Sequence, residues 1–295
     1  MNERAHPAVH ELEAGDATAA SGASIAPGGA LLGAGTVVIW NDIEPEGRDA
    51  FYAWHDKEHM VERLALPGFL RGRRYRKAGH SPEWLTLYEA DNLDALRSPE
   101  YLARLNAPTP QTTATLVHFA NTSRAVCRVG VSVGTSSGGY VLALRLDASS
   151  LPRSREPSDV GAANTGSGRS DESQANDTGF PPSRERQQER RVRISSIFAD
   201  AIALNGIVAC HHLVTDAEAS FVKTAESSTR KFDVPVAVIL LEATHEDAAE
   251  RARELFDAAP WESLGLALRA DAAVYALEIC RLAQRDPGAR QPGEH

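Results

Sequence analysis

Cysteine is scarce in this sequence: its 295 residues include three, Cys127, Cys210 and Cys280, and no Cys-x-x-Cys pair. Such spacing is typical of buried thiols in a reducing compartment and does not indicate a disulfide framework. There is also no apolar run of the roughly 18 residues that a membrane span needs. The start of the chain lacks the basic and then apolar order of a signal peptide. We therefore expect a cytoplasmic protein without membrane association.

Positive charge is in deficit, with 31 Lys and Arg against 40 Asp and Glu, and a formal net charge of −9. This balance argues against a general nucleic-acid binder or a protein of acidic membrane surfaces. The hydrophobic content of 42% is enough for a packed core. A chain of this length forms one large domain or two small ones. The expected partner is a small molecule.

Apolar residues are sparse in three segments of the chain. Residues 1–34 are rich in Ala, Gly and Ser, residues 149–188 in Ser, Arg, Asp, Gly and Asn, and residues 285–295 contain Pro and Gly. Such compositions bury too little surface to offset the entropy of ordering. We expect a disordered N-terminal tail, a disordered insertion and a loose C-terminal tail. The structured blocks that remain are 35–134 and 138–284.

The first block has the predicted order β-α-β-β-α-β. Pro45 suits the first turn of a helix, which Pro67-Gly68 ends. In the third strand, polar and aromatic residues alternate with leucine, which is the period of a strand. The expected elements are strands at 36–40, 69–77, 83–89 and 115–133 (bent near 121–124), a helix over 45–66, and short helices capped by Asn92 and Ser98.

The second block repeats this order, and two short alignments support an internal duplication. Leu87-Tyr88-Glu89-Ala90 matches Leu240-Leu241-Glu242-Ala243, and Pro67-Gly68-Phe69 matches Asn205-Gly206-Ile207. The expected elements are strands at 140–146, 206–212, 234–242 and 272–281, a helix over 189–204, and another capped by Thr244.

Units of this kind make a four-stranded antiparallel sheet with two helices on one face. The other face must be covered, and the second sheet is the natural cover. The predicted fold class is therefore α+β: two tandem ferredoxin-like βαββαβ repeats packed as an intrachain dimeric α/β barrel. The chain would be a pseudo-dimer by itself, and a homodimer of such chains stays open.

The stretch Trp54-His55-Asp56-Lys57-Glu58-His59 lies on the predicted helix of the first block. Residues three and four apart are neighbours on a helix, so the apolar stripe runs through Phe51, Trp54, Val61 and Ala65. Glu58 occupies a position in that stripe, and His55 and His59 flank it. Burying a carboxylate costs several kcal/mol unless it is paired. The candidate catalytic residues are therefore His55, Glu58 and His59.

The order Trp-His-x-x-Glu-His, Pro-Gly-Phe, the basic strand Arg73-Arg74-Tyr75 and the Leu-Tyr-Glu strand resembles the dimeric α/β-barrel superfamily. The likeness is greatest to EthD-like proteins and a bacterial branch with a Trp-His…Glu-His helix, and it covers residues 36–124. The superfamily includes cofactor-free monooxygenases, haem-handling enzymes, muconolactone-isomerase-like and dehydratase-like proteins. The resemblance implies a small, mostly apolar pocket between helix and sheet that contains a histidine.

The second block departs from the motif, since Arg193, Ser196 and Ile197 stand at the positions of His55, Glu58 and His59. We therefore expect one site per chain, in the first block. The five residues from His55 to His59 also satisfy His-x-x-Glu-His, a zinc-binding pattern. No suitable third ligand follows, so we predict no metal and no cofactor, while zinc and haem stay open.

The favoured function is an enzyme that acts on a small organic molecule by proton transfer, as a monooxygenase, isomerase or lyase. His55 and His59 would be the acid and base, and Glu58 would orient them. Arg74 is suited to bind an anionic group. Trp54, Tyr75 and Tyr88 would form the substrate-binding wall.

Two other interpretations compete with this one. The histidines and Glu58 could belong to a structural polar network with Arg73, Arg74 or Tyr88, and the protein would then be a non-catalytic ligand-binding or assembly module. A zinc-dependent hydrolase is the third alternative. Arg71, Arg76 and Lys77 are interpreted as charges that protect an edge strand.

Overall fold

The computed structural model describes residues 30–149, 184–228 and 231–284. The predicted tails and most of the predicted insertion lie outside these ranges. Within them, two predicted boundaries are wrong. Ala30 and Leu31 are buried, at 4% and 1% exposure, because they pack against the barrel. The helix after the insertion begins at Arg184.

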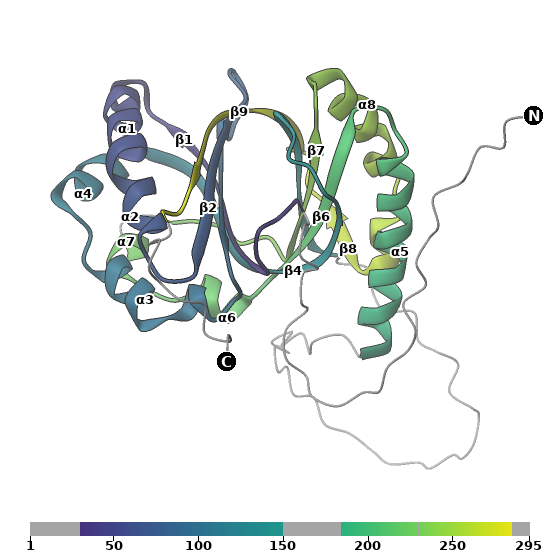
Figure 1. Ribbon diagram of the computed structural model, residues 1–295, viewed down its shortest axis with the longest axis horizontal. Coiled ribbons are helices and arrows are strands. Elements are labelled where there is room, and N and C mark those ends of the chain that lie inside the picture. Colours follow the sequence, from purple (N-terminus) through teal and green to yellow (C-terminus); the bar gives the residue numbers. More distant parts are fainter. Residues whose placement is uncertain (1–29, 150–183, 229–230, 285–295) are drawn as a thin grey trace, which may run out of the picture.

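Eight antiparallel strands close into a barrel in the order β7-β6-β4-β1-β3-β2-β9-β5, and β5 pairs back with β7. A short strand, β8, adds to β5. The protein is thus a mixed α+β structure around a closed antiparallel barrel (Figure 1). The strands are β1 (Gly35–Ile43), β2 (Phe69–Arg76), β3 (Trp84–Ala90), β4 (Phe119–Gly134), β5 (Tyr140–Ala148), β6 (Ile207–Thr215), β7 (Ala237–Ala243), β8 (Leu266–Leu268) and β9 (Ala273–Leu282).

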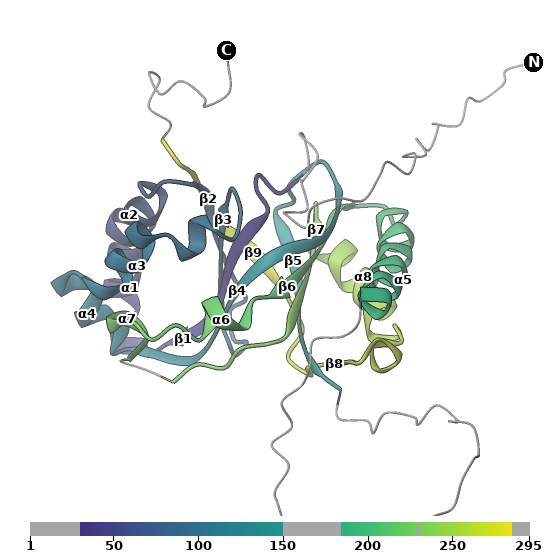
Figure 2. The same ribbon diagram turned by 90° about the horizontal axis from the view of Figure 1, so that it is seen from below.

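Helices flank the barrel on two sides (Figure 1). The first side holds η1 (Pro45–Gly47), α1 (Arg48–Trp54), η2 (His55–His59), α2 (Met60–Leu64), η3 (Ala95–Arg97), α3 (Pro99–Asn106) and α4 (Pro110–Leu116). The opposite side holds α5 (Arg184–Ile202), α8 (Glu246–Asp257) and η4 (Trp261–Leu264). The short helices α6 (Ala217–Ser220) and α7 (Ala225–Ser228) follow β6 in sequence, yet they lie beside α3 on the first side (Figure 2). In the described part of the chain, no helix is both long and apolar enough to span a bilayer.

Local signals place most of these elements where the sequence predicts them. The Asn92 side chain accepts a hydrogen bond from the Ala95 amide at 3.0 Å, and Ser98 caps α3 through the Tyr101 amide at 3.2 Å. Thr115 lies in α4 and not in the last strand of its block, because Thr109 caps an additional helix.

The prediction that Thr244 caps α8 is wrong. His245 holds the N-cap position, and the Thr244 hydroxyl bonds instead to the Gly206 carbonyl at 3.3 Å. Thr244 thus fixes the turn before β6 and not the start of the helix.

The interpretation of β2 as an edge strand is also wrong. β2 pairs with β3 on one side and with β9 on the other. Arg71 and Arg73 therefore point into the barrel, where both pair with Glu89 at 2.8 and 3.0 Å. Arg73 also reaches Glu242 at 2.8 Å, and all four side chains are at most 10% exposed. Charge on this strand joins the two halves of the barrel and does not protect an edge.

Candidate functional site

The helix that carries the motif changes its winding at the motif itself. Residues His55–His59 form one π-helical turn, η2, between the α-helical segments α1 and α2. A π turn adds a residue to the helix, and such turns occur frequently at functional sites. Residues after it are rotated relative to an uninterrupted α-helix.

This extra residue overturns the predicted apolar stripe. Val61 is 42% exposed and Ala65 faces solvent, whereas Met60 and Leu64 are buried at 0% and 5%. The same rotation directs His59, 8% exposed, toward the sheet. The period of 3.6 residues that the sequence suggested does not hold across η2.

Glu58 is half-buried and accepts a hydrogen bond from the Thr109 hydroxyl, which also caps α4. It lies outside the pocket wall that contains both histidines. Its contact with the start of α4 ties two helices together. An orienting role for Glu58 stays a prediction, and the geometry supplies a different partner for His55.

A pocket of about 570 Å³, measured out to its opening, lies between these helices and the outer face of the barrel. The floor comes from β1, β3 and β4, and the walls come from α1, η2, α2, α3, α4 and α7. Such a concave site between elements, with few polar groups, is the usual form of a small-molecule site. Its lining residues are Val37, Ile39, Asn41, Phe51, Trp54, His55, His59, Arg63, Thr86, Tyr88, Tyr101, Leu105, Leu116, Phe119, Arg124 and Glu226.

Three of the predicted site residues meet in this pocket around an aromatic wall. The rings of Trp54 and His59 lie 4.2 Å apart between centroids, and those of His55 and His59 lie 5.8 Å apart. The indole N–H of Trp54 donates to Thr112 Oγ1 at 2.9 Å, which fixes the ring that packs on His59. Tyr88 contributes from the sheet side, 6.3 Å from His59.

Arg74 sets the protonation of His55. Its Nη1 lies 3.0 Å from His55 Nδ1 and 2.5 Å from an Asp56 carboxylate oxygen, and its Nε donates to Glu278 at 2.8 Å. A guanidinium can only donate, so Nδ1 must accept and the imidazole proton resides on Nε2. Burial, and secondly the charge of Arg74, hold the pKa of His55 well below its ordinary value. His55 is therefore neutral at neutral pH, and Nε2–H remains for a ligand.

This tautomer can be tested by nitrogen NMR of the imidazole rings. In the parent protein at neutral pH, we expect Nδ1 of His55 to be unprotonated and Nε2 to carry the proton. Arg74→Met should raise the pKa of His55, because one of the two causes of its depression is removed. It should also allow the Nδ1–H form. An unchanged His55 spectrum in Arg74→Met would refute the assignment of Arg74 as the group that selects the tautomer.

Tyr75 and Tyr88, both predicted as pocket wall, lie on opposite faces of the sheet. Tyr88 lines the pocket, whereas Tyr75 belongs to the cluster inside the barrel, together with Trp40 and Tyr275. Burial raises the pKa of both phenols, so both are protonated at neutral pH. The structure therefore does not bring Tyr75 to the pocket.

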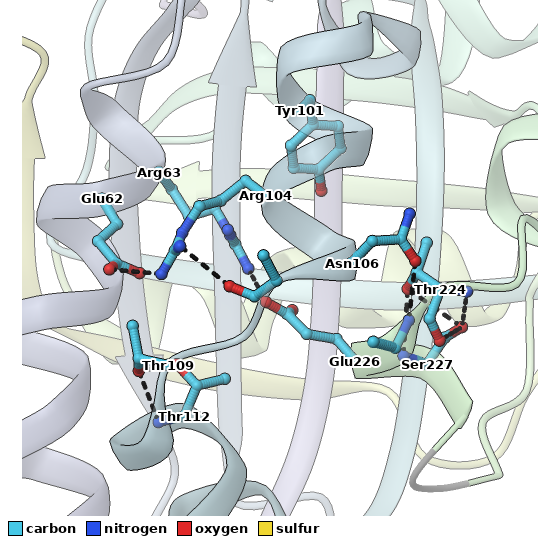
Figure 3. A network of polar contacts seen from close by, with 12 residues as sticks. Glu62, Arg63, Tyr101, Arg104, Asn106, Thr109, Thr112, Thr224, Glu226 and Ser227 are labelled. Atoms are coloured by element: carbon cyan, nitrogen blue, oxygen red, sulfur yellow. Dashed lines mark hydrogen bonds and ion pairs between the residues drawn. The ribbon is translucent and has the colours of Figure 1, made fainter.

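Sequence reasoning missed Arg63 and Glu226, which meet across the pocket rim. Arg63 of α2 donates to Glu226 of α7 in a buried ion pair, and the Arg63 guanidinium lies 5.9 Å above the Tyr101 ring (Figure 3). The Ala225 amide donates to Asn106 Oδ1 at 3.1 Å, which attaches α7 to α3. A segment of the second block thus completes a pocket of the first. No local signal could reveal this, because the two residues are 163 positions apart.

The corresponding space between helices and sheet in the second block is filled. Phe198, Phe256 and Trp261 pack there with Leu144 and other aliphatic residues, all at most 4% exposed. The pocket of the first block has no such counterpart among these side chains. This agrees with the absence of His, Glu and His from the equivalent helix.

Metal-ligand geometry does not form at the His-x-x-Glu-His pattern. Nδ1 of His55 is engaged by Arg74, and Glu58 is engaged by Thr109. Within the described ranges, the group of possible ligands that does converge is Glu44, Glu46 and His118, with both carboxylates exposed.

Comparison with known proteins identifies the fold. No family model matches the chain, and no curated protein matches it. Among solved structures, an anthrone oxidase-like protein is similar with a TM-score of 0.53 and 12% identity over 89% of this chain and 99% of that one. A variant of chlorite dismutase from Candidatus Nitrospira defluvii gives 0.46 and 7%, over 84% and 92%. A heme-binding protein from Thermus thermophilus gives 0.44 and 11%, over 83% and 91%. The fold is that of the dimeric α/β-barrel proteins, as the sequence resemblance implied.

Proposed function

We propose that this protein is a small-molecule enzyme whose active site is the pocket of the first block. The observation that carries the proposal is the neutral, buried His55, which Arg74 holds in one tautomer at 3.0 Å inside an aromatic pocket. A purely structural histidine does not need a donor on one nitrogen and a hollow before the other. Perturbed titratable groups in a cleft are typical of catalytic sites.

The chemistry that suits this arrangement is removal of a proton from carbon next to a carbonyl. The C–H bond breaks, the proton passes to the His59 imidazole, and the electron pair moves onto the substrate oxygen. His55 Nε2–H donates a hydrogen bond to that oxygen, as preorganised donors do in oxyanion sites. Monooxygenases, isomerases and lyases can share this first step, so the proposal covers all three classes.

Several finer features belong to the same proposal. The Trp54–His59 helix supports an EthD-like relationship. Tandem ferredoxin-like repeats are supported by the matching element order of the two halves, and by Glu89 and Glu242, which lie at the ends of β3 and β7 and both bind Arg73. Unpaired thiols support a cytoplasmic location. A pseudo-dimer within the chain, with or without a further homodimer, follows from the closed barrel.

Two substitutions test catalysis directly. Purified protein is incubated with a panel of aromatic ketones and phenols, and products are followed by mass spectrometry. His55→Ala and His59→Ala should each lower turnover by about 100-fold or more, as loss of a general acid or base does. Lys57→Ala is the matched control, because Lys57 is exposed on the same π-helical turn.

Circular dichroism and thermal unfolding separate the alternatives. Binding of panel members without turnover in any variant would favour a non-catalytic ligand-binding module. A loss of about 2 kcal/mol in stability on either histidine substitution, with no ligand bound, would favour the structural network. Metal analysis and the visible absorption spectrum of the purified protein decide whether zinc or haem takes part.

A further inference from the structure

Two hydrogen-bond donors inside the pocket have no protein acceptor among the described residues: Arg63 Nη1 and Tyr88 Oη. Both side chains line the pocket, and they are 3% and 2% exposed. A buried donor without a partner costs about 1–3 kcal/mol. Such groups are rare in native structures, and each calls for an explanation. A ligand oxygen that accepts from both would supply one.

The charges around the pocket favour an anionic oxygen. Arg63 is compensated by Glu226. Arg124 also lines the pocket, and its Nη2 donates to Tyr101 Oη at 3.3 Å, with no carboxylate in ion-pair range in the part of the chain that the structure describes. Two guanidinium groups therefore face one carboxylate, while His55 is neutral. A single negative charge would complete the balance, since buried charges need partners.

The space beyond these donors suits a flat molecule. A second cavity adjoins the pocket, and Tyr101, Leu105, Arg124 and Glu226 line both. On the opposite wall the rings of Phe51 and Trp54 lie 6.4 Å apart, and Phe119 contacts both. Aromatic walls pack against planar rings with little loss of side-chain entropy.

We propose that the pocket binds a flat aromatic monoanion, whose charged oxygen accepts hydrogen bonds from Tyr88 Oη and Arg63 Nη1. Arg63 and Tyr88 are then binding residues, and Glu226 of α7 is a positioning residue that fixes Arg63. This inference rests on the proposed function, because it assigns a ligand class to the same pocket. It adds that a segment of the second block controls recognition in the first.

A matched pair of tyrosine substitutions tests the proposal. Tyr75 Oη is also buried without a protein partner, but it lies inside the barrel. Tyr88→Phe and Tyr75→Phe each remove one unpartnered hydroxyl, so both should leave the melting temperature of the free protein unchanged or raise it. The probes are benzoate and 2-naphthoate, each compared with its primary amide by calorimetry. Tyr88→Phe should weaken carboxylate binding about tenfold or more, and Tyr75→Phe should not change it.

A double variant tests the arginine without leaving a charge buried alone. Arg63→Gln combined with Glu226→Gln replaces the ion pair by two amides, and we expect it to remove the preference for carboxylates over amides. Equal binding of acids and amides by the parent protein would overturn the proposal, as would equal effects of Tyr88→Phe and Tyr75→Phe. In both cases the pocket would still bind small molecules. Binding of neither acids nor amides would also count against the proposed function itself.

Discussion

Replacing Arg73 by methionine should lower the free energy of unfolding by about 3–5 kcal/mol, the usual cost of removing one partner of a buried ion pair. Arg73 is 1% exposed and links Glu89 of β3 to Glu242 of β7 across the barrel. Glu242 also accepts from the Gly138 amide at 2.9 Å and lies 3.3 Å from His211 Nε2. These partners hold the pKa of Glu242 at about 2. Without Arg73, a carboxylate would stay buried with part of its compensation gone.

Urea unfolding at pH 7 measures this effect, and two further variants interpret it. Lys77→Met is the control, because Lys77 follows the same strand but pairs with Glu250 at 3.3 Å near the surface. That exposed pair should contribute at most about 1 kcal/mol. Arg73→Met combined with Glu242→Gln should recover more than half of the loss, since the amide keeps the bonds to Gly138 and His211. A loss below about 1 kcal/mol in Arg73→Met would show that the network is not closed to water.

Acid should destabilise the protein between pH 6.5 and pH 4, before most carboxylates are protonated. Burial, followed by the charges of Arg190 and Arg128, lowers the pKa of His212 from 6.5 to about 4. In that interval the unfolded chain binds a proton that the folded chain does not, so stability falls as the pH falls. A shift of this size corresponds to about 3 kcal/mol at pH 4. His55, with a pKa also well below its ordinary value, acts in the same direction.

Urea unfolding at pH 7, 5.5 and 4 measures the slope. His212→Asn removes the titrating group and should flatten the profile between pH 6.5 and 4. His245→Asn is the control, because His245 is exposed at the start of α8 and asparagine is a good N-cap. A profile that is equally steep in His212→Asn and in the parent protein would show that His212 is hydrated or protonated in the folded state. Below pH 4.5, Glu242 adds a further loss as the pH approaches its folded pKa of about 2.

Much of the fold could be predicted because its signals are local. Alternation along Trp84–Ala90 identifies a strand, and β3 has those bounds. Proline at the start of η1 and Pro67-Gly68 before β2 mark the ends of the motif helix. Errors arose where a local rule had a competitor. The strand 115–133 was too long because Thr109, and not Thr115, starts the preceding helix.

The candidate site was harder to predict, because its parts depend on winding and on distant chain segments. His55 and His59 could be selected from their spacing. The assumption of an uninterrupted α-helix gave Glu58 a buried position, whereas the π turn of η2 assigns burial to His59 and Met60. Likewise, Arg74 could be listed as a basic residue, but its contact with His55 depends on which face of β2 turns outward.

By itself the sequence determined the order of strands and helices, the motif helix in the first block and the excess of acidic charge, because these follow from composition and from short periodicities. Tertiary structure alone decided which charges are buried, how His55 is protonated and which residues close the pocket. The physical reason is closure of the barrel. It places Arg73 between two glutamates, and it brings α7 from the second block against α2, so that Glu226 meets Arg63. Those interactions depend on burial and on contacts across the chain, which no local pattern records.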